Sequence, residues 1–264
     1  MKAINVSCLA LLIFLLSSCQ KLRDYLKPNN VEPPNCRVVV TIDKNNYPDE
    51  SYDESIHAVK YNHLGDPELI QEIHISLQGP IQDVHDDNNI LLYDDQRRLI
   101  QEGLGAENSQ RPSLRRYVYE GDSPLPLRDT FYTMDTIYVE EFEYDTRGRI
   151  VRETRRLVSQ PGGDSQPNQE ADLRYYYDIR GNRQENPANP GYQGIIEYSD
   201  KPSLYSLHRV WQLRYRDYSR NSTPTAATYN DKGLPEQFAD SSETYFQPFL
   251  SAAPGATVQY ECEE

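Results

Sequence analysis

Three glutamates offer the most direct chemistry in this sequence. Glu140, Glu141 and Glu143 lie close together along the chain, and glycoside hydrolysis requires two carboxylates that face each other. These glutamates belong to a run that alternates apolar and polar residues, so they are most simply the solvated side of a strand. The sequence therefore predicts no catalytic residues and a protein that is not an enzyme.

The histidines and cysteines do not have the spacing of metal ligands or redox pairs. The sequence contains no H-E-x-x-H, C-x-x-C or G-x-S-x-G motif, and no phosphate-binding glycine loop. Residues 83–89 are rich in the oxygen ligands that Ca²⁺ prefers, but they lack the order of an EF-hand loop and its late glutamate. We therefore expect a polar turn between strands there, with neither a metal nor a cofactor.

Tyrosine dominates the aromatic residues, with 21 Tyr against 6 Phe and 1 Trp. Exposed aromatic rows can stack on sugar rings or anchor a protein partner. The alternative is structural, because cross-strand tyrosine pairs stabilise a sheet. The candidate binding face consists of aromatic residues at alternate positions of strand-like runs: Tyr117, Tyr119, Tyr175, Tyr177, Trp211 and Tyr215.

The N-terminus has the pattern of an export signal. Lys2 supplies a positive charge, and residues 9–16 form an apolar segment that is too short to span a bilayer as a helix. The run LSSC at residues 16–19 then matches a lipobox, in which the Cys19 thiol accepts a lipid. We predict a lipoprotein signal peptide over 1–18 and acylation of Cys19, palmitate included. The alternative is an ordinary signal peptide followed by a chance cysteine.

A lipidated, flexible tether is expected at 19–35, since this segment is charged at first and then rich in proline and asparagine. The remaining residues, 36–264, are expected to form one tyrosine-rich β domain. The formal net charge of −14 disfavours a nucleic-acid partner, because phosphates would be repelled. The predicted location is the cell envelope, as an outer-membrane lipoprotein that faces either the periplasm or the outside.

Two cysteines remain in the expected domain, one near each end. Cys36 begins a strand-like run and Cys262 ends another. Export would place both in a compartment that permits disulfides. We predict that they pair and bring the first and last strands side by side, with two free thiols as the alternative.

One sequence motif recurs five times and organises the domain. It consists of tyrosine, an Asn or Asp, two variable residues, and then glycine in four of the five copies. The copies are Tyr61-Asn62 with Gly65, Tyr93-Asp94 with Arg97 in place of glycine, Tyr144-Asp145 with Gly148, Tyr177-Asp178 with Gly181, and Tyr229-Asn230 with Gly233.

Each copy has the chemistry of a β-hairpin turn. The Asn or Asp side chain accepts hydrogen bonds from the turn backbone, a type I turn follows, and glycine takes the left-handed conformation that closes a bulge. With Arg97 at that position, the second turn is either strained or different. Residues 114–119 and 210–215 are predicted to be further strands, and no helix of three turns is expected. Loops are expected at 78–89, 103–113, 120–130, 158–170 and 183–194.

The segment 143–150, with sequence EYDTRGRI, resembles the YD repeat of the Rhs and teneurin shells. More closely, residues 55–264 resemble small tyrosine-rich bacterial lipoproteins with hairpins of this kind. The resemblance implies an all-β fold: a meandering antiparallel sheet of hairpins, open or rolled, with no substantial helix. It implies no known activity, and the chain has too few repeats to enclose a toxin.

The sequence favours a membrane-anchored, non-enzymatic binding or structural module of the cell envelope. The expected partners are the membrane, reached through the lipid, and an envelope protein or glycan. The alternative is a glycan-binding or glycan-degrading accessory protein, which would need a cleft with facing carboxylates beside aromatic residues. A third hypothesis is an assembly component whose open sheet edges pair with other chains.

Overall fold

The computed structural model describes residues 34–46, 52–78, 81–104, 113–159, 170–184, 197–222, 226–238 and 256–263. The expected signal peptide, Cys19 and residues 20–33 of the tether lie outside this part. The strands are β1 Cys36–Asn46, β2 Tyr52–Tyr61, β3 Pro67–Gln78, β4 Ile81–Tyr93, β5 Leu99–Leu104, β6 Leu114–Tyr119, β7 Pro126–Tyr132, β8 Ile137–Tyr144, β9 Ile150–Ser159, β10 Glu170–Arg174, β11 Tyr176–Tyr177, β12 Arg183–Gln184, β13 Ala226–Tyr229, β14 Pro235–Phe238 and β15 Thr257–Cys262; the helical elements are the 3-10 helix η1 Leu204–Leu207 and the α-helix α2 Arg209–Tyr215.

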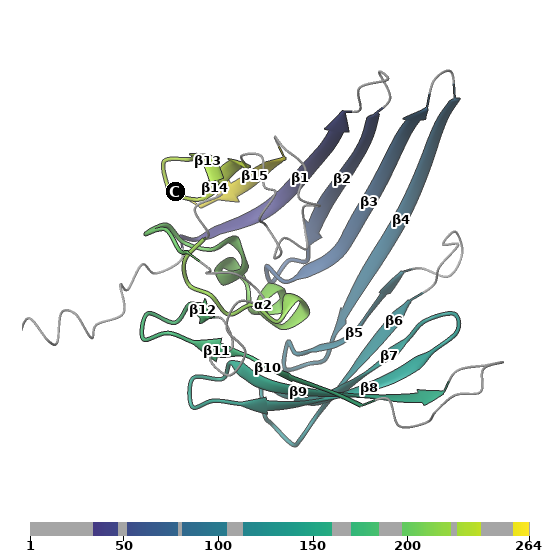
Figure 1. The fold of residues 1–264 in the computed structure, drawn as a ribbon, viewed down its shortest axis with the longest axis vertical. Helices are drawn as coiled ribbons and strands as arrows, with labels where there is room; N and C mark the ends of the chain where they lie inside the picture. Colours follow the sequence, from purple (N-terminus) through teal and green to yellow (C-terminus); the bar gives the residue numbers. More distant parts are fainter. Residues whose placement is uncertain are drawn as a thin grey trace, which may run out of the picture.

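One open antiparallel sheet of 13 strands dominates the fold, in the order β10-β9-β8-β7-β6-β5-β4-β3-β2-β1-β15-β14-β13. Successive strands from β1 to β10 are neighbours, as expected for a meander of hairpins. The sheet is bent so that β1–β4 and β5–β10 form two walls, with α2 between them (Figure 1). The predicted all-β, open antiparallel fold is therefore confirmed.

The first and last strands lie side by side and share a disulfide. Strand β1 pairs with β2 on one side and with β15 on the other, and Cys36 lies opposite Cys262 in the β1–β15 register. The two cysteines form the expected bond, across 226 positions of sequence. The strands β13–β15 are thereby attached to the N-terminal edge of the meander.

The five motif turns share one geometry. In the third, the Asp145 carboxylate accepts hydrogen bonds from the backbone N–H of Arg147 (2.9 Å) and of Arg149 (3.1 Å), and Gly148 takes a left-handed conformation. Every copy has a positive φ at the same position: 84° at Gly65, 60° at Arg97, 75° at Gly148, 92° at Gly181 and 78° at Gly233.

Arg97 keeps the left-handed turn conformation because its side chain gains a buried partner. Its guanidinium binds both carboxylate oxygens of Asp66 in the preceding turn, at 2.8 and 2.9 Å. Asp66 is almost fully buried. This two-point contact offsets the steric cost of a left-handed non-glycine residue.

We expect R97G to be less stable than the wild type, although glycine suits the backbone better. The substitution would leave the buried Asp66 carboxylate with only His208, whose Nε2 lies 3.3 Å away. Urea unfolding measures the change. A variant more stable than the wild type would show that backbone strain outweighs the ion pair.

The hydroxyl groups of the tyrosines explain why the motif uses tyrosine and not phenylalanine. The Tyr144 hydroxyl, at the end of β8, donates to the carbonyl of Pro126 at the start of β7, at 2.7 Å. The contact satisfies the carbonyl at the start of the neighbouring strand and fixes the turn against that strand. Three other motif tyrosines make equivalent bonds, Tyr61 to Val38, Tyr93 to Pro67 and Tyr177 to Ile150, so four of the five copies have one. Outside the motif, Tyr119 and Tyr260 bond in the same way to Leu99 and Pro235.

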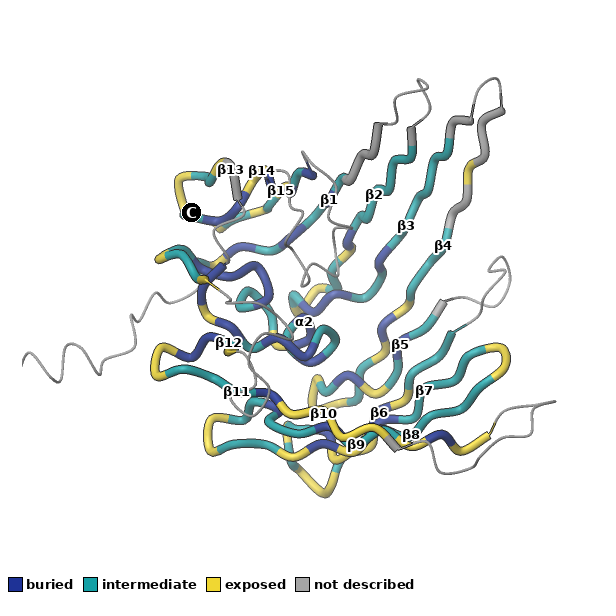
Figure 2. The backbone as a smooth tube through the Cα atoms, viewed as in Figure 1, coloured by how far each residue is buried: buried dark blue, intermediate teal, exposed yellow. Residues whose placement is uncertain are grey.

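The strand predicted at 210–215 is wrong, because these residues form helix α2. The His208 imidazole caps its N-terminus by accepting from the Val210 N–H, and Arg216 ends it in a left-handed conformation with φ of 55°. Val210, Trp211 and Leu213 turn their side chains into the core. The buried residues concentrate around this helix, inside the bend of the sheet (Figure 2). Burial of this apolar face outweighs the β propensity of valine, tryptophan and tyrosine.

The loops predicted at 78–89 and 120–130 are also too long. Strand β3 runs to Gln78 and β4 begins at Ile81, so the polar residues 83–89 belong to a strand and not to a turn. Strand β7 begins at Pro126. Pairing with β3 along the whole run, and with β5 from Asn89 onward, overrides the turn propensity of the aspartates and asparagines there.

Candidate functional site

A network of buried charges lies beneath α2. The Arg216 guanidinium donates to Glu153 at 2.9 Å, to Asp129 at 2.9 Å and to Glu140 at 3.1 Å. Arg115 binds Asp129 and Glu140 from the opposite side. The three carboxylates come from β7, β8 and β9, and each is almost fully buried. Burial of several charges at one place requires pairing of this kind.

The two central carboxylates respond differently to this environment. Burial raises the pKa of Asp129 to about 6, against the attraction of Arg115 and Arg216. Burial also opposes ionisation of Glu140, but the charges of Arg115, Arg216 and Arg155 outweigh it and lower the pKa of that carboxyl. Asp129 Oδ1 accepts no hydrogen bond within the described part of the chain.

Asp129 should make the protein less stable as the pH rises from about 4 to about 6. In the unfolded chain this group ionises near 3.8, whereas in the folded protein it keeps its proton to about 6. The unfolded state releases the proton first, so the free energy of unfolding falls across that window. D129N lacks this contribution, and its stability relative to the wild type should rise with pH in urea titrations.

E140Q is the matched control for this pH dependence. The lowered pKa of Glu140 means that its carboxylate stabilises the fold above about pH 4.5 and ceases to do so as the pH falls. The stability of E140Q relative to the wild type should therefore fall as the pH rises. Parallel curves for D129N and the wild type would contradict the assignment to Asp129.

The three glutamates considered for catalysis do not form a site. Glu140 points into the buried network, whereas Glu141 and Glu143 are exposed. Each oxygen of Glu140 is bound by arginine, with Arg155 on Oε1 and Arg115 on Oε2. A carboxylate held in this way neither donates a proton to a substrate nor attacks one.

A second polar group joins β2 and β3. Ser55 Oγ lies 2.7 Å from His74 Nδ1, and His74 Nε2 lies 2.7 Å from Glu72. His57 also contacts Glu72, and its hydrogen bond is the main reason that the pKa of Glu72 falls to about 2. The residues are cross-strand neighbours, so this is a polar row across the sheet and the cavity described below does not include it.

The candidate aromatic binding face is largely corrected by the structure, because three of its six residues are buried in the core, although Tyr119 lines the cavity described below. Tyr117 and Tyr175 are only 5% and 8% exposed, and Trp211 is fully buried. The Tyr117 hydroxyl donates to Glu102 at 2.8 Å, and the Trp211 and Tyr215 rings stack within α2. Rings covered in this way cannot stack on a sugar. Tyr119, Tyr177 and Tyr215 are partly buried and pack against the same core.

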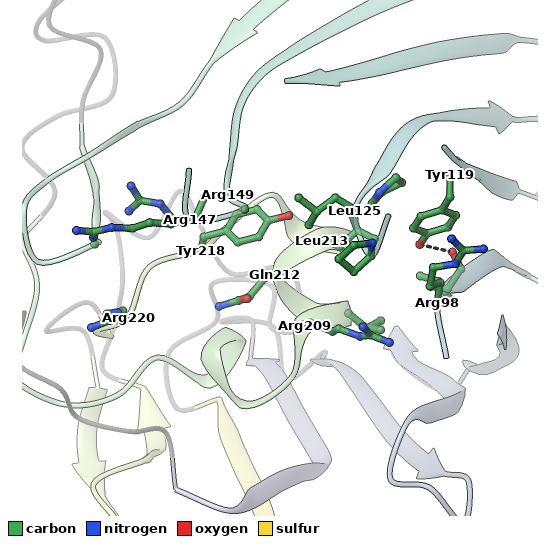
Figure 3. Close-up of a pocket in the computed structure, with 16 residues that line it drawn as sticks. Arg98, Tyr119, Leu125, Arg147, Arg149, Arg209, Gln212, Leu213, Tyr218 and Arg220 are labelled. Carbon is green, nitrogen blue, oxygen red and sulfur yellow. Dashed lines mark hydrogen bonds between the residues drawn. The ribbon is translucent and has the colours of Figure 1, made fainter. Parts of the chain in front are cut away.

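A cavity of about 260 Å³ lies where the turns of the sheet meet α2. The hairpin turns of β4–β5, β6–β7 and β8–β9 contribute to its wall, together with α2 and the segment that follows it. Figure 3 shows the arginine, tyrosine and leucine side chains around this space. The lining residues are Arg98, Leu99, Tyr119, Pro124, Leu125, Pro126, Arg147, Gly148, Arg149, Gly181, Arg209, Val210, Gln212, Leu213, Tyr218 and Arg220; we call this site the arginine pocket.

The arginine pocket is basic in an acidic chain. Five arginines and no carboxylate line it, although the net charge of the chain is −14. Two of these arginines are compensated by the aspartates of their own turns: Arg98 binds Asp94 at 2.7 Å and Arg149 binds Asp145 at 2.6 Å. The pocket therefore keeps an excess of positive charge, which favours an anionic ligand.

Two arginines of the hairpin turns are fixed by stacking as well as by ion pairs. Arg98 lies over the Tyr119 ring at 4.6 Å, and Arg149 lies over the Tyr177 ring at 4.1 Å. Each arginine follows the left-handed residue of its motif, and each ring belongs to a later hairpin. Guanidinium groups held in this way lose little freedom when they bind a ligand.

Polar groups of the pocket retain hydrogen-bonding capacity. Arg149 Nη1 is buried and, within the described ranges, donates to no acceptor. The structure also gives no hydrogen bond from the Tyr218 hydroxyl or the Gln212 amide to any described residue. Buried donors are normally satisfied, so an acceptor supplied by a ligand would complete this wall.

The sequence contained part of the signal for this pocket. Arg98 and Arg149 follow the left-handed position in two copies of the motif, so their equivalence was visible. Arg209, Gln212 and Tyr218 belong to α2 and the segment after it, and residues 210–215 of this region have the pattern of a strand. No local pattern shows that this region folds back onto the turns.

Comparisons with known proteins place the chain in no family. No protein-family model and no curated protein matches it. Among solved structures, it is similar to a porin-like protein from Bacteroides uniformis, with 11% identity, a TM-score of 0.45, and coverage of 88% of this chain and 97% of that one. A likeness of this degree carries no inference about function.

Two features are absent from the described residues. No helix there is long and apolar enough to cross a membrane. Within the same residues, no group of three or more His, Cys, Asp or Glu side chains is arranged to hold a metal ion.

Proposed function

We propose that this chain is an exported, lipid-anchored binding module of the cell envelope, without enzymatic activity, and that the arginine pocket is its ligand site. The observation that carries the proposal is the concentration of arginines around one cavity in a strongly acidic chain. Cavities that combine an apolar wall with a few convergent polar groups are the usual ligand sites of proteins.

The lipid anchor rests on the sequence of the N-terminus. The LSSC run at residues 16–19 supports acylation of Cys19, and the proline-rich segment before Cys36 would separate the domain from the bilayer. The outer membrane is the proposed location. The glycan-binding alternative has less support, because three of the six residues of its aromatic face, Tyr117, Tyr175 and Trp211, are buried.

Photo-crosslinking in intact cells tests the binding site. A photoreactive phenylalanine analogue would replace Gln212 inside the pocket or, as the control, Val118, which is 38% exposed on the sheet away from it. We expect a defined adduct, identified by mass spectrometry, only from position 212. Identical adducts from both positions, or none from either, would overturn the assignment of the pocket as the ligand site.

The anchor is tested separately by C19A. This variant should lose incorporated palmitate and move from the membrane fraction to the soluble fraction, because a multiply acylated chain is what retains the protein. Retention of C19A in the membrane fraction would contradict lipidation as the means of attachment, whatever the result at the pocket.

A further inference from the structure

The arginines of the pocket lie at two ends of the cavity. Arg147, Arg149 and Arg220 lie toward one end, and Arg98 and Arg209 lie toward the other (Figure 3). The space between the two ends has a different character, because the apolar and aromatic side chains of Leu125, Leu213 and Tyr218 form its walls (Figure 3). Leu99 and Val210 also line the cavity.

Each end holds an arginine that no carboxylate of the described residues neutralises. At one end, Arg149 is paired with Asp145, whereas Arg147 makes no ion pair with a carboxylate in the described part of the chain. At the other end, Arg98 is paired with Asp94, whereas Arg209 donates to the backbone carbonyl of Arg97 and has no carboxylate partner among the described residues. Arg147 and Arg209 are both exposed, so their charges are accessible to a ligand that enters the cavity.

The hydrogen-bonding groups of the cavity also differ between its ends and its middle. Arg149, which lines the first end, has a buried Nη1 without an acceptor among the described residues. The Gln212 amide and the Tyr218 hydroxyl lie between the two ends, beside the apolar wall (Figure 3). The pocket therefore offers charge-assisted donors at both ends and an apolar middle with neutral hydrogen-bonding groups.

We propose that the arginine pocket binds a small ligand that carries one anionic group at each end of a short apolar or aromatic body. This inference rests on the proposed function, and it names the class of ligand. A guanidinium binds both carboxylate and phosphate through paired N–H groups, so either anion satisfies the two ends. The volume of about 260 Å³ limits the body to roughly the size of one ring or a short aliphatic chain.

The closest physical alternative is that exposed arginines are only solvated, as most surface charges are. Solvation by water explains why Arg147 and Arg209, each taken alone, are exposed without an ion pair. It does not explain why five arginines line one cavity with an apolar wall, or why a buried donor of Arg149 lacks an acceptor. The positive charges of arginines that line one cavity repel each other, and an anion bound at each end would offset that repulsion.

The test compares matched mono- and dianions on the full-length, lipidated protein in detergent micelles, by isothermal titration calorimetry. Terephthalate is compared with benzoate, and hydroquinone bisphosphate with phenyl phosphate, so the two arms distinguish carboxylate from phosphate. We expect at least one dianion to bind about tenfold more tightly than its monoanion, since it makes a second charge-assisted contact.

Single substitutions at the two ends identify the binding mode. R147Q and R209Q should each reduce the preference for the dianion to near unity. R128Q, which alters an exposed arginine outside the cavity, should leave it unchanged. Thermal unfolding of each variant shows that the fold is intact.

Failure of this inference is distinguishable from failure of the proposed function. Equal affinity for dianion and monoanion in both arms would overturn the two-ended ligand, as would equal loss in R147Q, R209Q and R128Q. If position 212 still gives a specific adduct in cells, the pocket remains a ligand site for another chemistry. Absence of both the adduct and the binding of any anion would overturn both proposals.

Discussion

Replacing Arg216 with leucine should lower the free energy of unfolding by about 3–5 kcal/mol, because three buried carboxylates would lose a shared partner. Arg216 contacts Asp129, Glu140 and Glu153, and it is itself only 8% exposed. Arg115 would remain beside two of them, but Glu153 would keep only a long ion pair with the half-exposed Arg155, at 3.5 Å, and a hydrogen bond from the Tyr175 hydroxyl, at 3.3 Å, among the described residues. Removal of one member of a buried ionic network costs much more than loss of a surface ion pair.

The structure provides a reporter and a control for this measurement. Trp211 is the single tryptophan of the chain and is fully buried, so its fluorescence follows urea unfolding. R216G separates the charge from the backbone, since Arg216 has a left-handed φ of 55° that glycine adopts without strain. R216G should also be destabilised, though less than R216L. If R216G matched the wild type, backbone strain would offset most of what the arginine contributes.

The hairpin turns could be predicted from the sequence because their interactions are local. Asp145 reaches backbone groups no further than Arg149, and Gly148 lies between them. The same short range explains why the turn at Arg97 kept its geometry. What the sequence could not show was the long-range partner, Asp66 in the preceding turn, which makes a non-glycine residue tolerable there.

The buried network could not be predicted from the same patterns. In strand β8, Glu140 and Phe142 share the inner face, so the run does not divide cleanly into an apolar and a polar side. Glu140 was therefore assigned to solvent. Its partner Arg155 lies opposite it in the β8–β9 hairpin, but its partners Arg115, from β6, and Arg216, from the segment after α2, are far from it in the sequence.

Helix α2 could not be predicted from local sequence patterns either. Its residues favour strands, and its seven-residue length is too short for a helical periodicity to be evident. The helix is stable because the bent sheet provides an apolar surface for Val210, Trp211 and Leu213. The arginine pocket depends on this placement, since Arg209 and Gln212 reach the turns only from a helix inside the bend.

Removal of the disulfide should lower the free energy of unfolding by about as much as replacing Arg216 with leucine. Cys36 and Cys262 close a loop of 226 positions, and the chain-entropy model gives about 5 kcal/mol of stabilisation for a loop of this length. The double variant C36A/C262A should lose several kcal/mol in urea unfolding followed by Trp211 fluorescence. Reduction of the wild type with dithiothreitol should reproduce the loss, which separates the bond from any effect of the alanine side chains.

Amide hydrogen exchange distinguishes two ways in which the disulfide could stabilise the fold, because it shows which strands lose protection in the double variant. If it acts on the unfolded chain, all slowly exchanging amides of the sheet should lose protection equally in the double variant. If it acts by holding β15 to β1, protection should fall mainly at this junction, while β7 and β8 keep theirs. Strand β14 offers β15 only one register pair on its other side, Gln237 with Thr257. We therefore expect the junction to open first, with the uniform loss following at higher denaturant; a change below about 1 kcal/mol would contradict both.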